Sequence, residues 1–105
     1  MRNISVHDLA RWRSEGTDFV LLDVREPYEV QTASIPGSTV ISMREIPQRL
    51  GELPRDKPIA VLCHHGGRSE RVASFLRSQG FSEVSNVDGG IDAYARAVDP
   101  AIPRY

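Results

Sequence analysis

The stretch AVLCHHGGRSERVASFL, residues 60–76, joins three kinds of local sequence pattern. It begins as an apolar run, passes through a short polar bend with two glycines, and continues as an amphipathic segment. In that last part, Val72, Phe75 and Leu76 fall on one face of a helix and charged residues fall elsewhere. The stretch therefore predicts a buried strand, a loop and a helix, with Cys63 directly after the strand.

Strand-like runs and helix-like segments alternate along the rest of the chain. Short apolar runs, bounded by turn residues, indicate strands that are covered on both faces. The predicted strands cover residues 19–23, 39–42, 59–62 and 83–87. Connections this short indicate an α/β fold, in which a mainly parallel central sheet has helices on both faces. The length of 105 residues suits a single domain that spans residues 1–105.

The expected helices are marked by their end signals. Ser5 is a good first cap, Asp8 completes a capping box, and Gly16 can end that helix, with the ordered chain expected to begin at Ile4 and Ser5. A short helix is expected after Pro27, and another is expected to begin at Pro47 as its first residue. Two longer helices are expected, one from the bend to Gly80 and one over residues 91–98.

Composition excludes several classes of function. The net charge of −1 provides no basic field for nucleic acid or for an anionic membrane, so neither partner is expected. No apolar run approaches the roughly 20 residues of a membrane span, and the first residues lack the apolar core of a secretory signal. A single cysteine excludes an internal disulfide and suits a reducing compartment. We therefore expect a soluble, cytoplasmic protein.

The bend after Cys63 has the features of an anion-binding loop that contains a nucleophile. Ligands of open α/β sheets gather at the carboxyl ends of strands, where this cysteine is expected. Backbone N–H groups around Gly66 and Gly67 can turn inward, and the start of the next helix favours negative charge. Arg68 adds a full positive charge. This combination favours a reactive thiolate over an inert thiol at the end of a strand.

A metal site is the other chemical interpretation of this bend. Cysteine and histidine are both metal ligands, but Cys63, His64 and His65 are consecutive and cannot easily close around one ion. No second pattern of ligand spacing accompanies them. We therefore expect neither a metal nor a cofactor. The two histidines either line the rim of the site, adding charge or relaying protons, or are simply exposed loop residues.

The sequence resembles the single-domain kind of rhodanese-like sulfurtransferase. The segment CHHGGRS after an apolar strand is similar to the active-site loop of that family. LLDVREPYE resembles its Asp-x-Arg segment, ASIPGS matches its Ile-Pro-Gly turn, and VDGGIDAYARAVDPAIPRY resembles its closing helix and tail. The order and spacing of these segments run through most of the chain. The chain departs from the family at Ala33-Ser34, where Gly-His is common, and at Tyr94, where many members have tryptophan.

The resemblance implies a rhodanese fold and a two-step sulfur transfer. Cys63 would take the outer sulfur of thiosulfate or a persulfide donor and pass it to cyanide, a thiol or a sulfur-relay protein. The resemblance assigns the loop around the bound sulfur to six residues. They are His64, His65, Gly66, Gly67, Arg68 and Ser69. Asp23 and Arg25 would either brace this site or form a plain structural ion pair.

Two alternatives share the same loop. A persulfide carrier would use the same cysteine but would depend on a dedicated protein acceptor. A rhodanese-fold cysteine phosphatase would need Cys-x5-Arg, whereas only four residues separate Cys63 from Arg68 here. The tighter ring suits one added sulfur atom better than a phosphate. Sulfur transfer is therefore the favoured interpretation.

Overall fold

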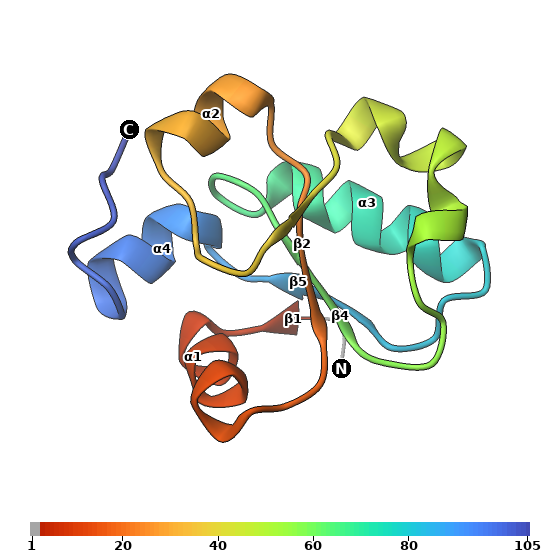
Figure 1. Cartoon of the computed structure of the whole chain (residues 1–105), viewed down its shortest axis with the longest axis horizontal. Helices are drawn as coiled ribbons and strands as arrows, with labels where there is room; N and C mark the ends of the chain where they lie inside the picture. Colours follow the sequence, from red (N-terminus) through yellow and green to blue (C-terminus); the bar gives the residue numbers. More distant parts are fainter. Residues whose placement is uncertain (1–2) are drawn as a thin grey trace.

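A computed structural model describes residues 3–105 and contains one five-stranded sheet (Figure 1). Its strand order is β1-β5-β4-β2-β3, and every neighbouring pair is parallel. The strands are β1 (Asn3–Ile4), β2 (Val20–Asp23), β3 (Thr39–Val40), β4 (Ile59–Leu62) and β5 (Val84–Val87). The predicted α/β fold with a parallel sheet is therefore confirmed. Because all the strands run the same way, their carboxyl ends meet at one edge.

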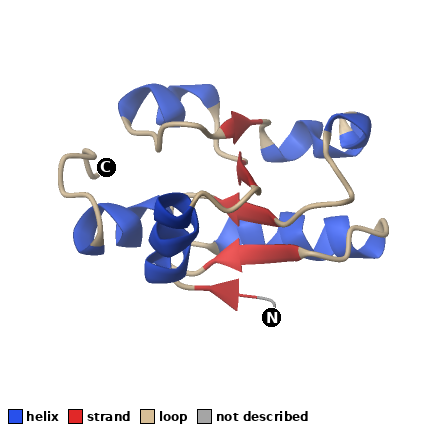
Figure 2. Cartoon of the chain, turned by 60° about the horizontal axis from the view of Figure 1, so that its bottom comes forward, coloured by secondary structure: helices blue, strands red, loops and turns tan. Residues whose placement is uncertain are grey.

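Helices cover both faces of the sheet, as Figure 2 shows. On one face, α1 (Val6–Glu15) and α4 (Gly90–Ala97) enclose a core around Leu9, Leu62 and Ile91. On the other face, α3 (Gly67–Ser78) and the 3₁₀ helix η1 (Met43–Gln48) enclose a core around Val61, Leu76 and Phe81. The four residues of β4 are all buried, which explains the continuous apolar run that predicted this strand.

The predicted ends of α1 are confirmed. The Ser5 side chain accepts a hydrogen bond from the Asp8 backbone, and the Asp8 carboxylate accepts one from the Ser5 backbone. Gly16 follows the helix with φ of 72°, a left-handed conformation that glycine adopts without strain. The short helix α2 (Pro27–Thr32) begins at proline, also as predicted.

Three expectations for the sheet and the short helices are wrong in detail. The strand expected over 39–42 is only Thr39–Val40, because the chain turns into η1 after Ser42. Pro47 lies inside η1 rather than at its start. Proline has no N–H, so it removes only one hydrogen bond from this short 3₁₀ turn and is tolerated there. A second turn, η2 (Leu50–Glu52), follows. The strand Asn3–Ile4, which pairs with β5, was missed because two residues carry no periodic signal.

Candidate active site

The cysteine that the sequence singled out lies at the carboxyl edge of the sheet, between β4 and α3. The Cys63 side chain is buried, and the residue is only 1% exposed. Its Sγ accepts a hydrogen bond from the backbone N–H of Gly66 at 3.0 Å. Gly66 has φ of 110°, which a residue with a side chain rarely adopts, and this conformation closes the loop over the sulfur. The sulfur therefore lies in a turn of backbone at the start of a helix.

Ser69, on the first turn of α3, supplies a second donor to the thiol. Its Oγ lies 3.2 Å from Cys63 Sγ and also forms a short hydrogen bond to Oδ1 of Asn86 on β5. A serine hydroxyl has one proton, so it donates to one of these acceptors at a time. Asn86 was missed in the sequence, although a buried polar residue within the apolar run of β5 was the available signal.

Arg68 forms an ion pair that the sequence analysis did not predict. Its guanidinium donates two hydrogen bonds, of 2.6 and 2.8 Å, to the carboxylate of Glu29 on α2. The bonds from Arg68 hold the pKa of Glu29 at about 2, far below its ordinary value, and Glu29 raises the pKa of Arg68. The predicted cation thus lies in the segment after Cys63, and a carboxylate balances its charge. Glu29 was overlooked because no spacing rule links α2 to the loop after β4.

Asp23 and Arg25 form an ion pair in which both side chains are fully buried. Arg25 Nη2 lies 2.6 Å from Asp23 Oδ2 and also donates to the carbonyl oxygen of Ala33. Arg25 contacts Glu29, the partner of Arg68, in two ways. It donates to the backbone carbonyl oxygen of Glu29, and it donates to the hydroxyl of Tyr105, which in turn donates to the Glu29 carboxylate. This geometry corresponds to the structural interpretation of the pair, and a bracing role for the site stays a prediction.

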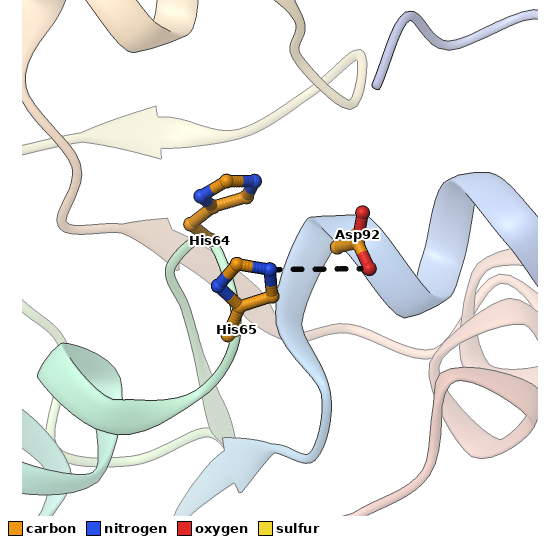
Figure 3. A group of neighbouring side chains, drawn as sticks. All are labelled: His64, His65 and Asp92. Atoms are coloured by element: carbon orange, nitrogen blue, oxygen red, sulfur yellow. Dashed lines mark ion pairs between the residues drawn. The ribbon is translucent and has the colours of Figure 1, made fainter. Parts of the chain in front are cut away.

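The rings of His64 and His65 are stacked on each other (Figure 3). The His64 ring is sandwiched between His65 and Tyr105, with both centroids 3.9 Å away. Burial, followed by the neighbouring His65, lowers the pKa of His64 and thus favours its neutral form. His65 is largely exposed and points toward Asp92 on α4, 4.0 Å away.

The residues best placed to hold a metal are His64, His65 and Asp92, whose donor atoms lie within 4.8 Å of one another. Two observations oppose coordination. The imidazole planes are stacked at 28°, so their in-plane lone pairs do not converge on one point. Asp92 is also held by Arg96 and Arg104, and the bond from Arg104 lowers the pKa of its carboxyl. The arrangement therefore suits a rim of polar side chains better than a metal centre.

A second helix, α4, supports the loop through backbone hydrogen bonds. At the start of α4, Ile91 donates its N–H to the carbonyl oxygen of Cys63, and Asp92 donates to that of His64. Gly90 makes this approach possible, since a Cβ there would lie 2.5 Å from the Cys63 carbonyl oxygen. The loop is therefore held from outside, while its interior faces the thiol.

The predicted loop residues come together around one pocket. It has a volume of about 310 Å³ and is lined by Cys63, His64, His65, Gly67, Arg68 and Arg71. The hydrogen bonds from Gly66 and Ser69 reach the sulfur of Cys63. Among the residues that line this pocket, only Arg71 was missed by sequence reasoning, because one helical turn separates it from the loop. The site can therefore bind a small anion above a nucleophilic sulfur.

Comparison with known proteins gives a consistent result. The sequence matches the family described as Rhodanese-like domain over residues 5–97. It is 38% identical to "Thiosulfate sulfurtransferase GlpE" of Pseudoalteromonas translucida over 87 residues, 83% of either chain. It is 48% identical to "Rhodanese-like/PpiC domain-containing protein 12, chloroplastic" of Arabidopsis thaliana over 89 residues, 81% of this chain and 30% of that protein.

The fold is similar to that of solved structures. A rhodanese-related protein from Thermoplasma volcanium is 33% identical, and each chain is covered completely with a TM-score of 0.86. Among residues 3–105, no helix is both long and apolar enough to cross a membrane.

Proposed function

Because the chain belongs to the rhodanese-like domain family, we propose that it transfers sulfane sulfur from thiosulfate or a similar donor through a Cys63 persulfide. One observation carries this proposal: the Gly66 N–H donates to a buried thiol at the start of a helix. This donor is fixed by the backbone before any substrate arrives. A fixed donor stabilises negative charge on sulfur without reorganisation during the reaction.

In the first half-reaction, the Cys63 thiolate attacks the outer sulfur of the donor. A sulfur–sulfur bond forms to Cys63, and the bond between the two sulfurs of thiosulfate breaks. Its electron pair leaves with sulfite. The terminal sulfur of the persulfide then carries the negative charge. The Gly66 N–H and the Ser69 hydroxyl, which lie 3.0 and 3.2 Å from Sγ, stabilise the Cys63 thiolate before the attack.

In the second half-reaction, an acceptor attacks the terminal sulfur and regenerates the Cys63 thiolate. The sequence contains no second cysteine that could serve as an internal acceptor. The acceptor therefore comes from outside these 105 residues, and we propose cyanide, a small thiol or a sulfur-relay protein. A reducing, cytoplasmic compartment suits a protein that works through one free thiol.

The surroundings of Arg68 favour sulfur over phosphate. A phosphatase loop uses its arginine to hold a phosphate dianion, but Arg68 already donates two hydrogen bonds to Glu29. Backbone N–H groups are sufficient for a single sulfur with one negative charge. The phosphatase alternative would require Arg68 to leave a carboxylate that is 5% exposed.

Intact mass spectrometry of the protein mixed with thiosulfate tests the proposal. We expect the mass to increase by one sulfur atom, peptide mapping to place that atom on Cys63, and cyanide to remove it as thiocyanate. Fast turnover with small acceptors would identify an enzyme, whereas loading that discharges only to a protein would identify a carrier. The absence of any added sulfur would contradict the proposal, and hydrolysis of an aryl phosphate would then support the phosphatase alternative.

A further inference from the structure

The positive charges around the reactive pocket differ in how they are balanced. Arg68 is paired with Glu29 through two hydrogen bonds. His65 points toward Asp92 and is charged only when protonated. The third basic residue of the lining is Arg71. Within residues 3–105, its guanidinium has no hydrogen-bond or ion-pair partner. Arg71 therefore provides the only permanent, unbalanced charge in the described lining of this pocket.

The position of Arg71 on α3 brings that charge to the mouth of the pocket. It lies four residues after Gly67, so the two residues share one face of the helix, and both line the pocket. The Arg71 residue is exposed, whereas Cys63 lies buried at the bottom. A small ligand that touches the sulfur with one end therefore presents its other end to Arg71.

We propose that Arg71 binds the anionic group of the sulfur donor and so determines a preference for donors of the thiosulfate type. This inference rests on the proposed function. The reacting outer sulfur of thiosulfate must point down toward Cys63, which leaves the sulfonate in the mouth of the pocket. A guanidinium there forms charge-assisted hydrogen bonds with two sulfonate oxygens. Arg68 cannot supply the same net attraction, because Glu29 cancels its charge.

The charge balance of the reaction fits this division of roles. The thiolate and the thiosulfate dianion enter with three negative charges, and the persulfide and the sulfite dianion leave with three. One of these charges lies on the sulfonate oxygens of the donor and one on its outer sulfur, and two lie on the departing sulfite. Arg71 therefore neutralises charge that the loop N–H groups, which face Cys63, do not reach.

The lone cysteine allows anion recognition to be measured separately from sulfur transfer. Iodoacetate and iodoacetamide alkylate the same thiol and have the same leaving group, but only iodoacetate is an anion. We expect Arg71→Gln to lower the ratio of the two alkylation rates by about three- to tenfold at low ionic strength. Arg71→Lys should retain most of the ratio. Arg11→Gln, which removes an exposed charge from α1 on the other face of the sheet, should leave it unchanged.

Donor use gives the second measurement with the same variants. We expect Arg71→Gln to lower kcat/KM for thiosulfate about tenfold, mainly through KM. It should affect methanethiosulfonate, which carries one charge fewer, much less. Equal alkylation ratios in wild type and Arg71→Gln would overturn the inference even if the wild type loads sulfur. If the wild type gains no sulfur from thiosulfate, the proposed function fails, and the assignment of a donor to Arg71 fails with it.

Discussion

The helices α3 and α4 begin in the same way but serve the site differently. Each follows the carboxyl end of a strand, and the two strands, β4 and β5, are neighbours in the sheet. Each helix has a glycine with positive φ as its first cap, with φ of 110° at Gly66 and 79° at Gly89. Neither helix has a side chain as its cap. From this local pattern alone, both helix starts are candidates for binding an anion.

Their backbone N–H groups differ in what they contact. At α4, the N–H groups of Ile91 and Asp92 are already bonded to the carbonyl oxygens of Cys63 and His64. At α3, the N–H of Gly66 donates to the sulfur of Cys63. The start of α4 therefore holds the loop in shape, and the start of α3 directs an N–H group at the thiol. A glycine turn before a helix identifies a site only when its donors have no structural acceptor.

The third residue of each helix reinforces this difference. In α3 it is Ser69, a neutral donor that lies 3.2 Å from the thiol. In α4 it is Asp92, whose carboxylate pairs with Arg104 and Arg96. A carboxylate is favourable at a helix start that binds no other anion, whereas it would repel a persulfide. The neutral hydroxyl of Ser69 thus suits a helix start that faces the thiol, and the carboxylate of Asp92 suits one whose N–H groups bond to carbonyl oxygens.

The largest effect is expected when the sulfur that accepts the hydrogen bond at the start of α3 is removed and both helices are left intact. Cys63→Ser should abolish persulfide formation, because an alcohol does not provide a thiolate at neutral pH. The free energy of unfolding should change by no more than about 1 kcal/mol. Mass spectrometry after mixing with thiosulfate and a urea titration provide the two measurements. Sulfur loading by this variant would remove Cys63 from the mechanism.

Gly90→Ala breaks the contact of α4 with the loop. The new Cβ would lie 2.5 Å from the Cys63 carbonyl oxygen, and φ of 62° is strained for alanine. We expect a loss of about 2–5 kcal/mol in the free energy of unfolding, seen as a lower melting temperature and a lower urea midpoint. Gly67→Ala is the matched control, since its Cβ meets nothing within 4 Å. Equal melting temperatures for the two variants would show that α4 does not hold the loop.

The ion pair beside α3 makes stability depend on acid in a predictable direction. The pKa of Glu29 falls from 4.5 to about 2 on folding, mainly through its bonds from Arg68. Because folding lowers the pKa of this carboxyl, its ionised form stabilises the fold at any pH above its pKa in the unfolded chain, about 4.5. That contribution is lost as the pH falls from about 4.5 to 2. Glu29→Gln should therefore cost about 1–3 kcal/mol at neutral pH and progressively less below pH 4.5.

Urea titrations of wild type and Glu29→Gln between pH 7 and pH 2 measure this difference. Glu52→Gln is a suitable control, because it breaks an exposed pair with Arg49 and should change stability little at any pH. A constant difference between wild type and Glu29→Gln across the range would mean that the Arg68 pair does not govern the stability of this region.

Local signals were enough to predict the frame of the fold and the reactive loop. The strand before Cys63, the bend and the amphipathic α3 are all encoded within residues 60–76. The capping box at Ser5 and the left-handed Gly16 are equally local. Because parallel strands end at one edge, the sequence also predicted that Cys63 lies at that edge of the sheet. These features depend on neighbours within a few residues, which is what sequence patterns record.

The features that sequence reasoning missed all depend on contacts between distant segments. Glu29 reaches Arg68 across 39 residues, and the Tyr105 hydroxyl reaches Arg25 across 80. Asn86 meets Ser69 only because β5 lies beside β4. Arginine in a loop predicts a charge but not the carboxylate that balances it. Only the structure could therefore show which positive charge is left unbalanced and can attract a ligand.

The smallest expected effect distinguishes the side-chain donor of α3 from its backbone donor. Ser69→Ala removes the hydroxyl beside the thiol and leaves the Gly66 N–H in place. We expect thiosulfate to load Cys63 about three- to tenfold more slowly. We also expect the free energy of unfolding to fall by about 1 kcal/mol, because the hydrogen bond to Asn86 is lost. Ser74→Ala, at an exposed position on the same helix, is the control for both measurements. If Ser69→Ala loads as fast as wild type while losing stability, the hydroxyl serves Asn86 alone. The backbone turn at Gly66 would then be sufficient to distinguish the start of α3 from that of α4.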